Sequence, residues 1–296
     1  MEKLFDAEGM TRSERYFHTP SAFARKHLCY VQEVGQLKSL KPHVSSRENL
    51  ESFLFFFVKG GSGSVSYEGK EYELKKGDAV LLDCAEHYEH KSSENDPWEL
   101  AWIHFDGAKA EALYPQFKKQ NEGSPCIRLA AQEQRAADLI GELLKMKGEN
   151  SSLGEIFADT VVSRVLLLCM EQAGTKAAGT AERDFEGVRE YLNTQIQSTS
   201  DDMETLKTSL EEKYNISFAE VSTAFEKRYG ISLEDYAKNR MFNKAKELLR
   251  FTIKPVEEIV EESGIHNADI FRALFLENEE MSPEDYRKKW AQWIKG

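Results

Sequence analysis

The first half of the chain alternates apolar and polar positions in the short periods that are typical of β-strands. Aromatic and branched residues fill these stretches, and turns such as Glu68-Gly69-Lys70 separate them. Strands are therefore expected over 53–58, 64–67, 71–74 and 79–82. Several short strands separated by turns predict a small β-sandwich or barrel over residues 15–128.

A later strand is expected over residues 98–105, where successive side chains point to opposite faces. Trp102 and His104 share one face, and Ala101 and Ile103 share the other. One face of a small barrel has to be filled or has to enclose a ligand. We therefore take Trp102 and His104 as candidate pocket residues.

Beyond Pro125 the apolar residues recur at helical spacing. Residues 129–174 are predicted to form a helical region for dimerisation and linkage, because the apolar stripe of 153–172 is wider than one core needs. The small, polar segment 174–179 marks the boundary of a C-terminal helical domain over 183–294. Helices are expected over 132–147, 153–172, 183–196, 203–213, 217–228, 232–250, 255–263, 267–277 and 283–294.

Two of the expected helix starts carry capping signals. Pro255 stands at a first-turn position, where its missing N–H costs nothing. Ser282 precedes Pro283 and an acidic first turn, as an N-cap residue does. These signals support the helical interpretation of the C-terminal region.

The C-terminal region repeats a pattern of short helix, tight turn and second helix. The second helix carries Val221 and Phe225 at i and i+4 in the first unit, and Phe271 and Phe275 in the second. A strongly periodic helix around 239–249 joins the two units. This is the helix-turn-helix pattern, in which the second helix of a unit can enter a major groove.

The segment from about residue 185 to 290 resembles the DNA-binding domain of the AraC/XylS family, in which a long helix joins two helix-turn-helix units. The front half is similar to the cupin-like ligand-binding domain of that family, through Gly77-Asp78 and the run from Pro97 to Phe105. The matching strings of the C-terminal region are Ile231-Ser232…Tyr236, Arg240…Lys244-Ala245-Lys246-Glu247-Leu248-Leu249, Val256-Glu257-Glu258-Ile259, Ser263-Gly264 and Met281-Ser282-Pro283-Glu284-Asp285-Tyr286-Arg287. The resemblance implies an α+β protein, with a cupin-like β-sandwich or barrel and following helices before an all-α domain.

The resemblance also implies a function: a one-component transcriptional regulator that is not an enzyme. A small-molecule effector would bind the front domain of a homodimer, and the helix-turn-helix units would dock on double-stranded DNA. The residues expected near base edges are Ser222, Thr223, Asn267 and Arg272. Those expected near phosphates are Lys227, Arg228, Arg240, Lys244 and Lys246.

Charge leaves a second interpretation open. The chain has 39 Lys and Arg against 51 Asp and Glu, a net charge of −12, which excludes indiscriminate phosphate binding. Residues 183–296 hold 17 Lys and Arg against 23 Asp and Glu, and Glu220 and Glu277 stand where DNA would be contacted. The alternative is an effector-binding or interaction protein on the same scaffold, with weakened or lost DNA binding.

A further acidic residue, Glu280, occupies a turn position where the family usually has glycine. A left-handed backbone costs a non-glycine residue on the order of 1 kcal/mol relative to glycine. The turn before Met281 is therefore expected to be reshaped.

Candidate chemistry in the front half points to ligand binding rather than catalysis. His87 and Tyr88 are expected at the pocket or its rim, together with Trp102 and His104. The chain has no nucleophile elbow, phosphate-binding loop or dinucleotide fingerprint. The paired-histidine motif of metal-binding cupins is absent upstream, so no catalytic residue, metal or cofactor is expected. Aromatic pocket walls suit sugars and other small molecules equally.

The cysteine spacing and the hydropathy of the chain indicate the cellular compartment of the protein. The cysteines, Cys29, Cys84, Cys126 and Cys169, are widely spaced and are expected to be reduced and mostly buried. No apolar run approaches the roughly 20 residues of a membrane span, and the start of the chain lacks a secretory signal pattern. A cytoplasmic protein is expected.

Overall fold

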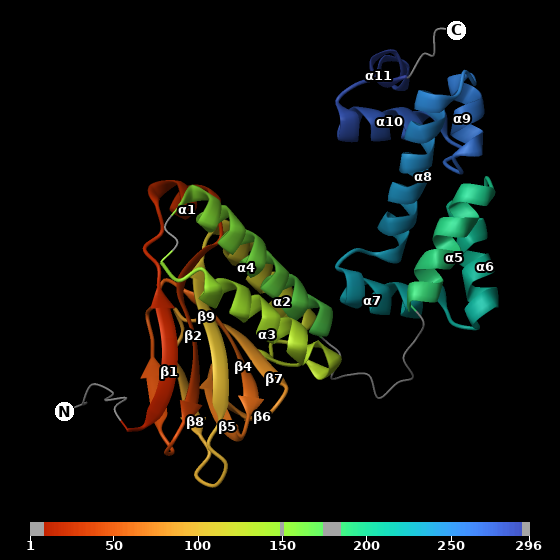
Figure 1. Cartoon of the computed structure of the whole chain (residues 1–296). Helices are drawn as coiled ribbons and strands as arrows, with labels where there is room; N and C mark the ends of the chain where they lie inside the picture. The colour runs from red at the N-terminus through yellow and green to blue at the C-terminus, as the bar shows by residue number, and fades with distance from the viewer. Residues whose placement is uncertain (1–8, 149–150, 174–184, 292–296) are drawn as a thin grey trace. The chain divides into compact units, whose positions relative to one another are not determined.

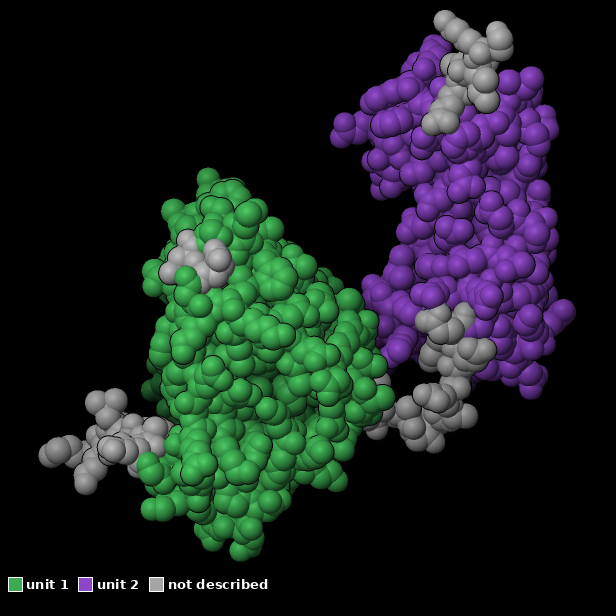
Figure 2. Space-filling model, in the orientation of Figure 1, with its two compact units in different colours: residues 1–179 green, residues 180–296 purple. Residues whose placement is uncertain are grey.

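The computed structural model describes residues 9–148, 151–173 and 185–291 (Figure 1). The chain divides into two compact units, residues 1–179 and residues 180–296 (Figure 2). Each unit buries apolar clusters of its own. The predicted α+β fold class is confirmed, whereas the boundary expected at Gly174 to Gly179 lies outside the described residues.

Unit 1 is built on a sandwich of two antiparallel sheets. The six-stranded sheet contains, in spatial order, β1 (Thr11–Phe17), β2 (Tyr30–Ser39), β9 (Glu99–Asp106), β4 (Phe53–Gly60), β7 (Asp78–Asp83) and β10 (Cys126–Arg128). The four-stranded sheet contains β3 (Val44–Arg47), β8 (Tyr88–Ser92), β5 (Ser62–Tyr67) and β6 (Lys70–Lys75). All five of the strands expected from the sequence are therefore present.

The six-stranded sheet is apolar on both faces, which explains the unbroken hydrophobic run of β4. Phe55 and Phe57 enter one core, and Leu54 and Phe56 enter the other, as alternation along a strand requires. The same alternation divides β9: Ala101, Ile103 and Phe105 join the first core, and Leu100 and Trp102 join the second. The faces predicted for residues 98–105 are confirmed.

Helices cover the outer face of the six-stranded sheet. The four α-helices of the described part of unit 1 are α1 (Ala22–His27), α2 (Ala108–Gln120), α3 (Glu133–Lys145) and α4 (Ser152–Gln172). α3 and α4 pack on β2, and the apolar side chains of both helices belong to the same core as the sheet (Figure 1). The helices expected over 132–147 and 153–172 therefore complete unit 1 rather than only linking it to unit 2.

Several elements of unit 1 were not predicted from the sequence. β1 and β3 are edge strands with mostly polar side chains, so they lack the apolar alternation that marks a strand. β10 has only three residues, and α2 contains Pro115 within the helix. Tertiary pairing, rather than local pattern, stabilises these elements.

Unit 2 consists of helices in two small cores that share one long helix. Its helices are α5 (Phe185–Ser198), α6 (Met203–Tyr214), α7 (Phe218–Tyr229), α8 (Leu233–Phe251), α9 (Val256–Glu262), α10 (Ala268–Glu279) and α11 (Pro283–Trp290). Leu233 and Met241 of α8 enter the core of α5, α6 and α7. Phe242 and Leu249 enter the core of α9, α10 and α11. All the expected helices are present, although residues 183–184 and 292–294 lie outside the described part.

The helix ends follow local chemistry closely. The Ser282 side chain accepts a hydrogen bond from the Asp285 amide and caps α11 as predicted. Pro255 is the N-cap residue of α9, one position before the first-turn position expected for it. Glu280 ends α10 with φ +56°, so the expected reshaping of that turn is wrong: the left-handed geometry is kept with Glu in place of Gly.

Candidate functional site

A cavity of about 80 Å³ lies between the two sheets of unit 1. This volume is several times the space that one water molecule needs. Its apolar and aromatic walls are formed by Leu37, Leu54, Phe56, Tyr88, Leu100 and Trp102. Its polar lining is formed by Arg15, Glu33, His43, Ser45, Arg47, His90 and His104. An apolar cavity with a few convergent polar groups is typical of a small-molecule site.

A chain of hydrogen bonds fixes the ring of His104 in this cavity. The Arg47 Nη1 atom lies 3.4 Å from His104 Nε2, and Ser52 Oγ lies 3.0 Å from His104 Nδ1. Because a guanidinium can only donate, Nε2 is the acceptor and Nδ1 carries the proton. Ser52 Oγ in turn donates to the Phe53 carbonyl at 3.2 Å. The chain therefore defines one neutral tautomer of His104.

A second polar group lies on the six-stranded sheet, on strands β1, β2 and β9. Arg15 Nη1 lies 3.6 Å from Glu33 Oε1, and the indole N–H of Trp102 donates to the same oxygen at 3.3 Å. The Arg15 guanidinium also lies over the Trp102 ring, 5.5 Å from its centre. Glu33, which is buried, is thus neutralised by Arg15 and tied to the aromatic wall.

The imidazoles of the cavity are uncharged near neutral pH. Burial, followed by the charge of Arg47, lowers the pKa of His104 to about 3. Burial, with the neighbouring imidazoles and Arg47, lowers the pKa of His90 to about 3 as well. The permanent charges of the cavity are therefore those of Arg15, Arg47 and Glu33.

Three of the four predicted ligand-binding residues, Tyr88, Trp102 and His104, line this cavity. Their role in ligand binding stays a prediction. His87 does not line it: the side chain is exposed, and its Nε2 lies 2.9 Å from Ser46 Oγ. Tyr88 points inward, so its neighbour in the extended chain points outward, and a place for His87 at the rim stays a prediction.

The remaining polar lining was missed in the sequence. Arg15, Glu33 and Arg47 lie on strands β1, β2 and β3, of which β1 and β3 are polar edge strands without a recognisable pattern. Ser45 and Arg47 are two positions apart and so share one face of a strand. The sequence does not show that this face lines a cavity, because that follows only from the pairing of β3 with β8. Among the described residues, no group of three His, Cys, Asp or Glu side chains is arranged to hold a metal ion.

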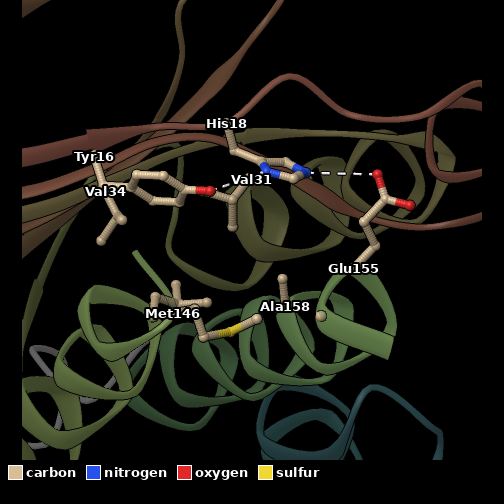
Figure 3. A pocket seen from close by; sticks show the side chains of 9 residues that line it. Tyr16, His18, Val31, Val34, Met146, Glu155 and Ala158 are labelled. Carbon is tan, nitrogen blue, oxygen red and sulfur yellow. Dashed lines mark hydrogen bonds and ion pairs between the residues drawn. The ribbon is translucent and has the colours of Figure 1, made fainter. Parts of the chain in front are cut away.

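A smaller cavity of about 20 Å³ lies on the other face of the sheet, beneath α3 and α4 (Figure 3). The Tyr16 hydroxyl lies 3.3 Å from His18 Nδ1, and His18 Nε2 lies 3.5 Å from Glu155 Oε1. Ser21 donates to Glu155 from its backbone N–H and from its hydroxyl, each at 2.6 Å. Burial opposes ionisation of Glu155, yet these hydrogen bonds hold its pKa below the usual value. The cluster ties the segment between β1 and α1 to α4.

In unit 2, α7 and α10 are the second helices of the two helix-turn-helix units. Val221 and Phe225 face the core, so Thr223 lies on the exposed side of α7, while Ser222 is half-buried beside it. Glu220 does not project its charge freely, because its carboxylate accepts from Ser217 Oγ at 2.9 Å at the start of the helix. A carboxylate in a first turn stabilises the helix.

The exposed face of α10 has a different character. Asn267 caps the helix, with Oδ1 accepting from the amides of Asp269 and Ile270. Arg272 is exposed, but so are the apolar side chains of Ile270 (54% exposed) and Leu276 (67%). This face therefore combines one cation with apolar and acidic groups.

Of the five residues predicted near phosphates, four have side chains that reach the surface, and the fifth, Lys244, is buried. Lys227 and Arg228 lie at the end of α7, and Arg240 is half-buried on α8. Lys246 pairs with Glu279 at 3.0 Å. Lys244 is only 8% exposed, and its ammonium donates to the Thr199 carbonyl at 2.7 Å. The expectation that Lys244 reaches a phosphate is wrong, because its ammonium is used inside unit 2.

Comparison with known families agrees with this architecture. The model of AraC-like ligand-binding domains matches residues 31–166, and a helix-turn-helix domain model matches residues 210–289. Together these matches cover well over half of the chain. The fold and sites thus define a DNA-binding regulator with a ligand-binding front domain. The chain belongs to the AraC family of transcriptional regulators, a family that is not enzymatic, as the sequence predicted.

Individual relatives span most of the chain at low identity. The lactose operon transcription activator of Staphylococcus xylosus is 21% identical over 79% of this chain and 83% of its own length. The Msm operon regulatory protein of Streptococcus mutans is 20% identical over 81% and 85%. The match to the solved structure of the AraC-like transcriptional activator CuxR covers 80% of this chain and 87% of that chain, with 11% identity and a TM-score of 0.37.

No helix in the described part of the chain has the length and apolarity needed to cross a membrane.

Proposed function

We propose that α7 and α10 enter major grooves of one operator, and that a small molecule between the sheets of unit 1 controls this binding. The observation that carries the proposal is the duplication in unit 2. Both helices start at a side-chain cap, and α8 contributes to the cores of both units. In helix-turn-helix proteins the second helix of each unit contacts base edges.

The proposed DNA contacts follow from exposure and chemistry. Thr223 with Ser222 on α7, and Arg272 on α10, would approach base edges, since they lie away from the buried residues of their helices. Asn267 uses its Oδ1 as a cap, which leaves its amide N–H groups for DNA. The proposed phosphate contacts are Lys227, Arg228, Arg240 and Lys246.

A mobility-shift assay with the DNA upstream of the protein's own operon tests this proposal. We expect a sequence-specific shift that weakens steeply with salt. Arg272→Ala should lower the affinity about 5- to 100-fold and relax the base preference at one position. Arg12→Ala removes the same charge from an exposed position on β1 in unit 1, and should change nothing. The complete absence of a specific shift would refute the proposal.

A second candidate is favoured by the composition of α10. Asp269 and Glu277 flank the exposed Ile270 and Leu276, and carboxylates are repelled by phosphates. In this candidate α7 alone holds the DNA. Arg272→Ala would then leave the shift unchanged, whereas Lys227→Ala would weaken it.

The proposal includes a sugar-derived effector. The walls of the cavity include Phe56, Tyr88 and Trp102, and flat aromatic rings pack well against small ring-shaped ligands. A relative is named for the lactose operon, which supports the same class for this chain. Isothermal titration calorimetry with glucose, glucuronate and glucose 6-phosphate tests it.

The proposal also includes a homodimer formed through α4. Four large apolar side chains of this helix are exposed: Leu153 (78%), Ile156 (47%), Phe157 (42%) and Leu167 (50%). Contiguous exposed apolar groups of this kind mark protein–protein contacts. Sedimentation velocity at micromolar concentration should show a dimer, which Ile156→Glu should dissociate and Leu276→Glu should not. A wild-type monomer would contradict this part of the proposal.

A further inference from the structure

We propose that the effector of this regulator is a small organic anion, whose carboxylate or phosphate oxygens pair with the guanidinium of Arg47. The inference deepens the proposed function, because it assumes that the cavity between the sheets is the effector site. It names a chemical class that the family resemblance leaves open.

The register of β3 with β8 places Arg47 on the face of β3 that lines the cavity. Arg47 pairs with Tyr88 and Ser45 pairs with His90 across β3 and β8, and all four side chains line the cavity. The intervening Ser46 points outward to the exposed His87. Arg47 is exposed to solvent and also lines the cavity, so its guanidinium is accessible to a ligand that enters from solvent.

The guanidinium of Arg47 has donors to spare. It makes one hydrogen bond, from Nη1 to His104 Nε2, and it forms no ion pair with any carboxylate of the described residues. A guanidinium carries five N–H donors in a planar fork that matches the oxygens of a carboxylate or phosphate. His104, whose ring is bonded to Ser52, accepts one of these N–H groups, and the other donors remain for a ligand.

The charge balance of the cavity favours a ligand with negative charge. The one acidic side chain of its lining, Glu33, is already paired with Arg15 and bonded to Trp102. The lining imidazoles are neutral, so the positive charge of Arg47 has no acidic partner in the cavity lining. A net positive cavity stands out in a chain whose total charge is −12. A neutral sugar would leave this charge without a partner, whereas a monoanion would balance it.

The other lining residues indicate the shape and polarity of the rest of the ligand. Trp102, Phe56 and Tyr88 present apolar faces. His90 Nδ1 is buried and has no hydrogen-bond partner within the described residues. A small ring with one anionic group and at least one hydrogen-bonding group fits this set. Sugar acids, sugar phosphates and aromatic carboxylates share that chemistry.

Isothermal titration calorimetry of the full-length protein with matched probes tests the inference. Glucuronate and glucose 6-phosphate each differ from glucose in carrying an anionic group, and benzoate differs from benzamide in the same way. We expect at least one anion of the panel to bind about tenfold or more tightly than its neutral counterpart. The response of glucuronate against glucose 6-phosphate then distinguishes a carboxylate from a phosphate.

Variants assign the binding to Arg47. Arg47→Gln should lower the affinity for the anion about tenfold or more, and Arg47→Lys should restore part of it, since a lysine keeps the charge without the fork. Arg12→Gln removes the same charge from an exposed position on β1 that does not line the cavity, and should have no effect. Circular dichroism of each variant checks that unit 1 remains folded.

Three results would overturn the inference. They are equal or tighter binding of the neutral probe, an Arg47→Gln affinity no lower than that of Arg12→Gln, and no binding of any anion of the panel at 10 mM. Mobility shifts with the same probes separate this test from that of the proposed function. Arg47-dependent anion binding without any effect on DNA would refute the regulatory role alone. A neutral sugar that binds and alters the shift would refute the anion alone.

Discussion

The charge of a side chain in this protein is decided by its surroundings, and His104 is the clearest example. It is 7% exposed, and burial beside Arg47 lowers its pKa to about 3. In the unfolded chain the His104 imidazole is protonated below about pH 6.5, whereas in the folded protein it stays neutral down to about pH 3. Folding is therefore progressively destabilised as the pH falls from about 6.5 towards 3.

We expect this penalty in unfolding experiments on the wild-type protein and His104→Gln. Between pH 7.5 and pH 5.0 the wild type should lose about 2 kcal/mol more free energy of unfolding than the variant, at about 1.4 kcal/mol per pH unit. Urea unfolding followed by tryptophan fluorescence measures the difference. His87→Gln changes an exposed imidazole and should follow the wild type. Parallel pH dependence of the wild type and His104→Gln would contradict the assignment.

Lys244 gives a second prediction at the level of one residue. Burial lowers its pKa, and its ammonium bonds to the Thr199 carbonyl. Lys244→Met should lower the stability of unit 2 by about 1–3 kcal/mol, because a carbonyl loses its partner. Lys246→Met breaks the partly exposed pair with Glu279 and the contact of the ammonium with the Phe242 ring, and should cost about 1 kcal/mol or less. Thermal unfolding followed at 222 nm compares the two variants.

The same pair tests the reassignment of Lys244 in DNA binding. The salt dependence of the mobility shift should be unchanged by Lys244→Met, since this ammonium faces the protein. A decrease of about one in the slope of log affinity against log salt would show that Lys244 contacts a phosphate after all.

Among the elements, the end of α10 shows how tertiary structure maintains an unfavourable local geometry. Glu280 has φ +56° at the C-cap, a conformation that favours glycine. Phe271 and Phe275 on one side, and Tyr286 on the other, anchor both flanks of this turn in one core. The packing of the flanks therefore fixes the turn, whichever residue occupies it.

Glu280→Gly should accordingly stabilise unit 2 by about 1 kcal/mol. Glu277→Gly, three residues earlier and inside the helix, is the matched control and should destabilise it by about 0.5–1 kcal/mol. Chemical denaturation gives both free energies of unfolding. A destabilising Glu280→Gly would mean that the carboxylate makes a contribution larger than the strain.

At the scale of the whole molecule, the apolar clusters predict two folding units. Among the residues that the structure describes, the clusters of unit 1 end at Ala173 and those of unit 2 begin at Val188. Fragments 1–179 and 180–296 should therefore each fold when expressed alone, with cooperative transitions near those of the full chain. Circular dichroism and calorimetry test this. Failure of the shorter fragment to acquire helical structure would show that unit 2 depends on unit 1.

The sequence predicted much of this fold because several of its patterns are local. Phe53 to Val58 indicated a strand, Ser282 a helix start, and the Val221/Phe225 and Phe271/Phe275 pairs a duplicated unit. Arg47 gave no such signal, because a polar edge strand looks like a loop until it is paired. Lys244 was misjudged for the related reason that helical spacing does not show which lysine turns towards a carbonyl.

By itself, the sequence determined the α+β class and the helices of unit 2, since periodicity and capping act between residues a few positions apart. Its motif strings carried the resemblance to the family. Only the tertiary structure decided which polar groups meet. Glu33 is neutralised by Arg15 and Arg47 faces His104 because strands distant in sequence are brought into register. Charge in a folded protein depends on neighbours in space, and these neighbours come from pairings that no local pattern encodes.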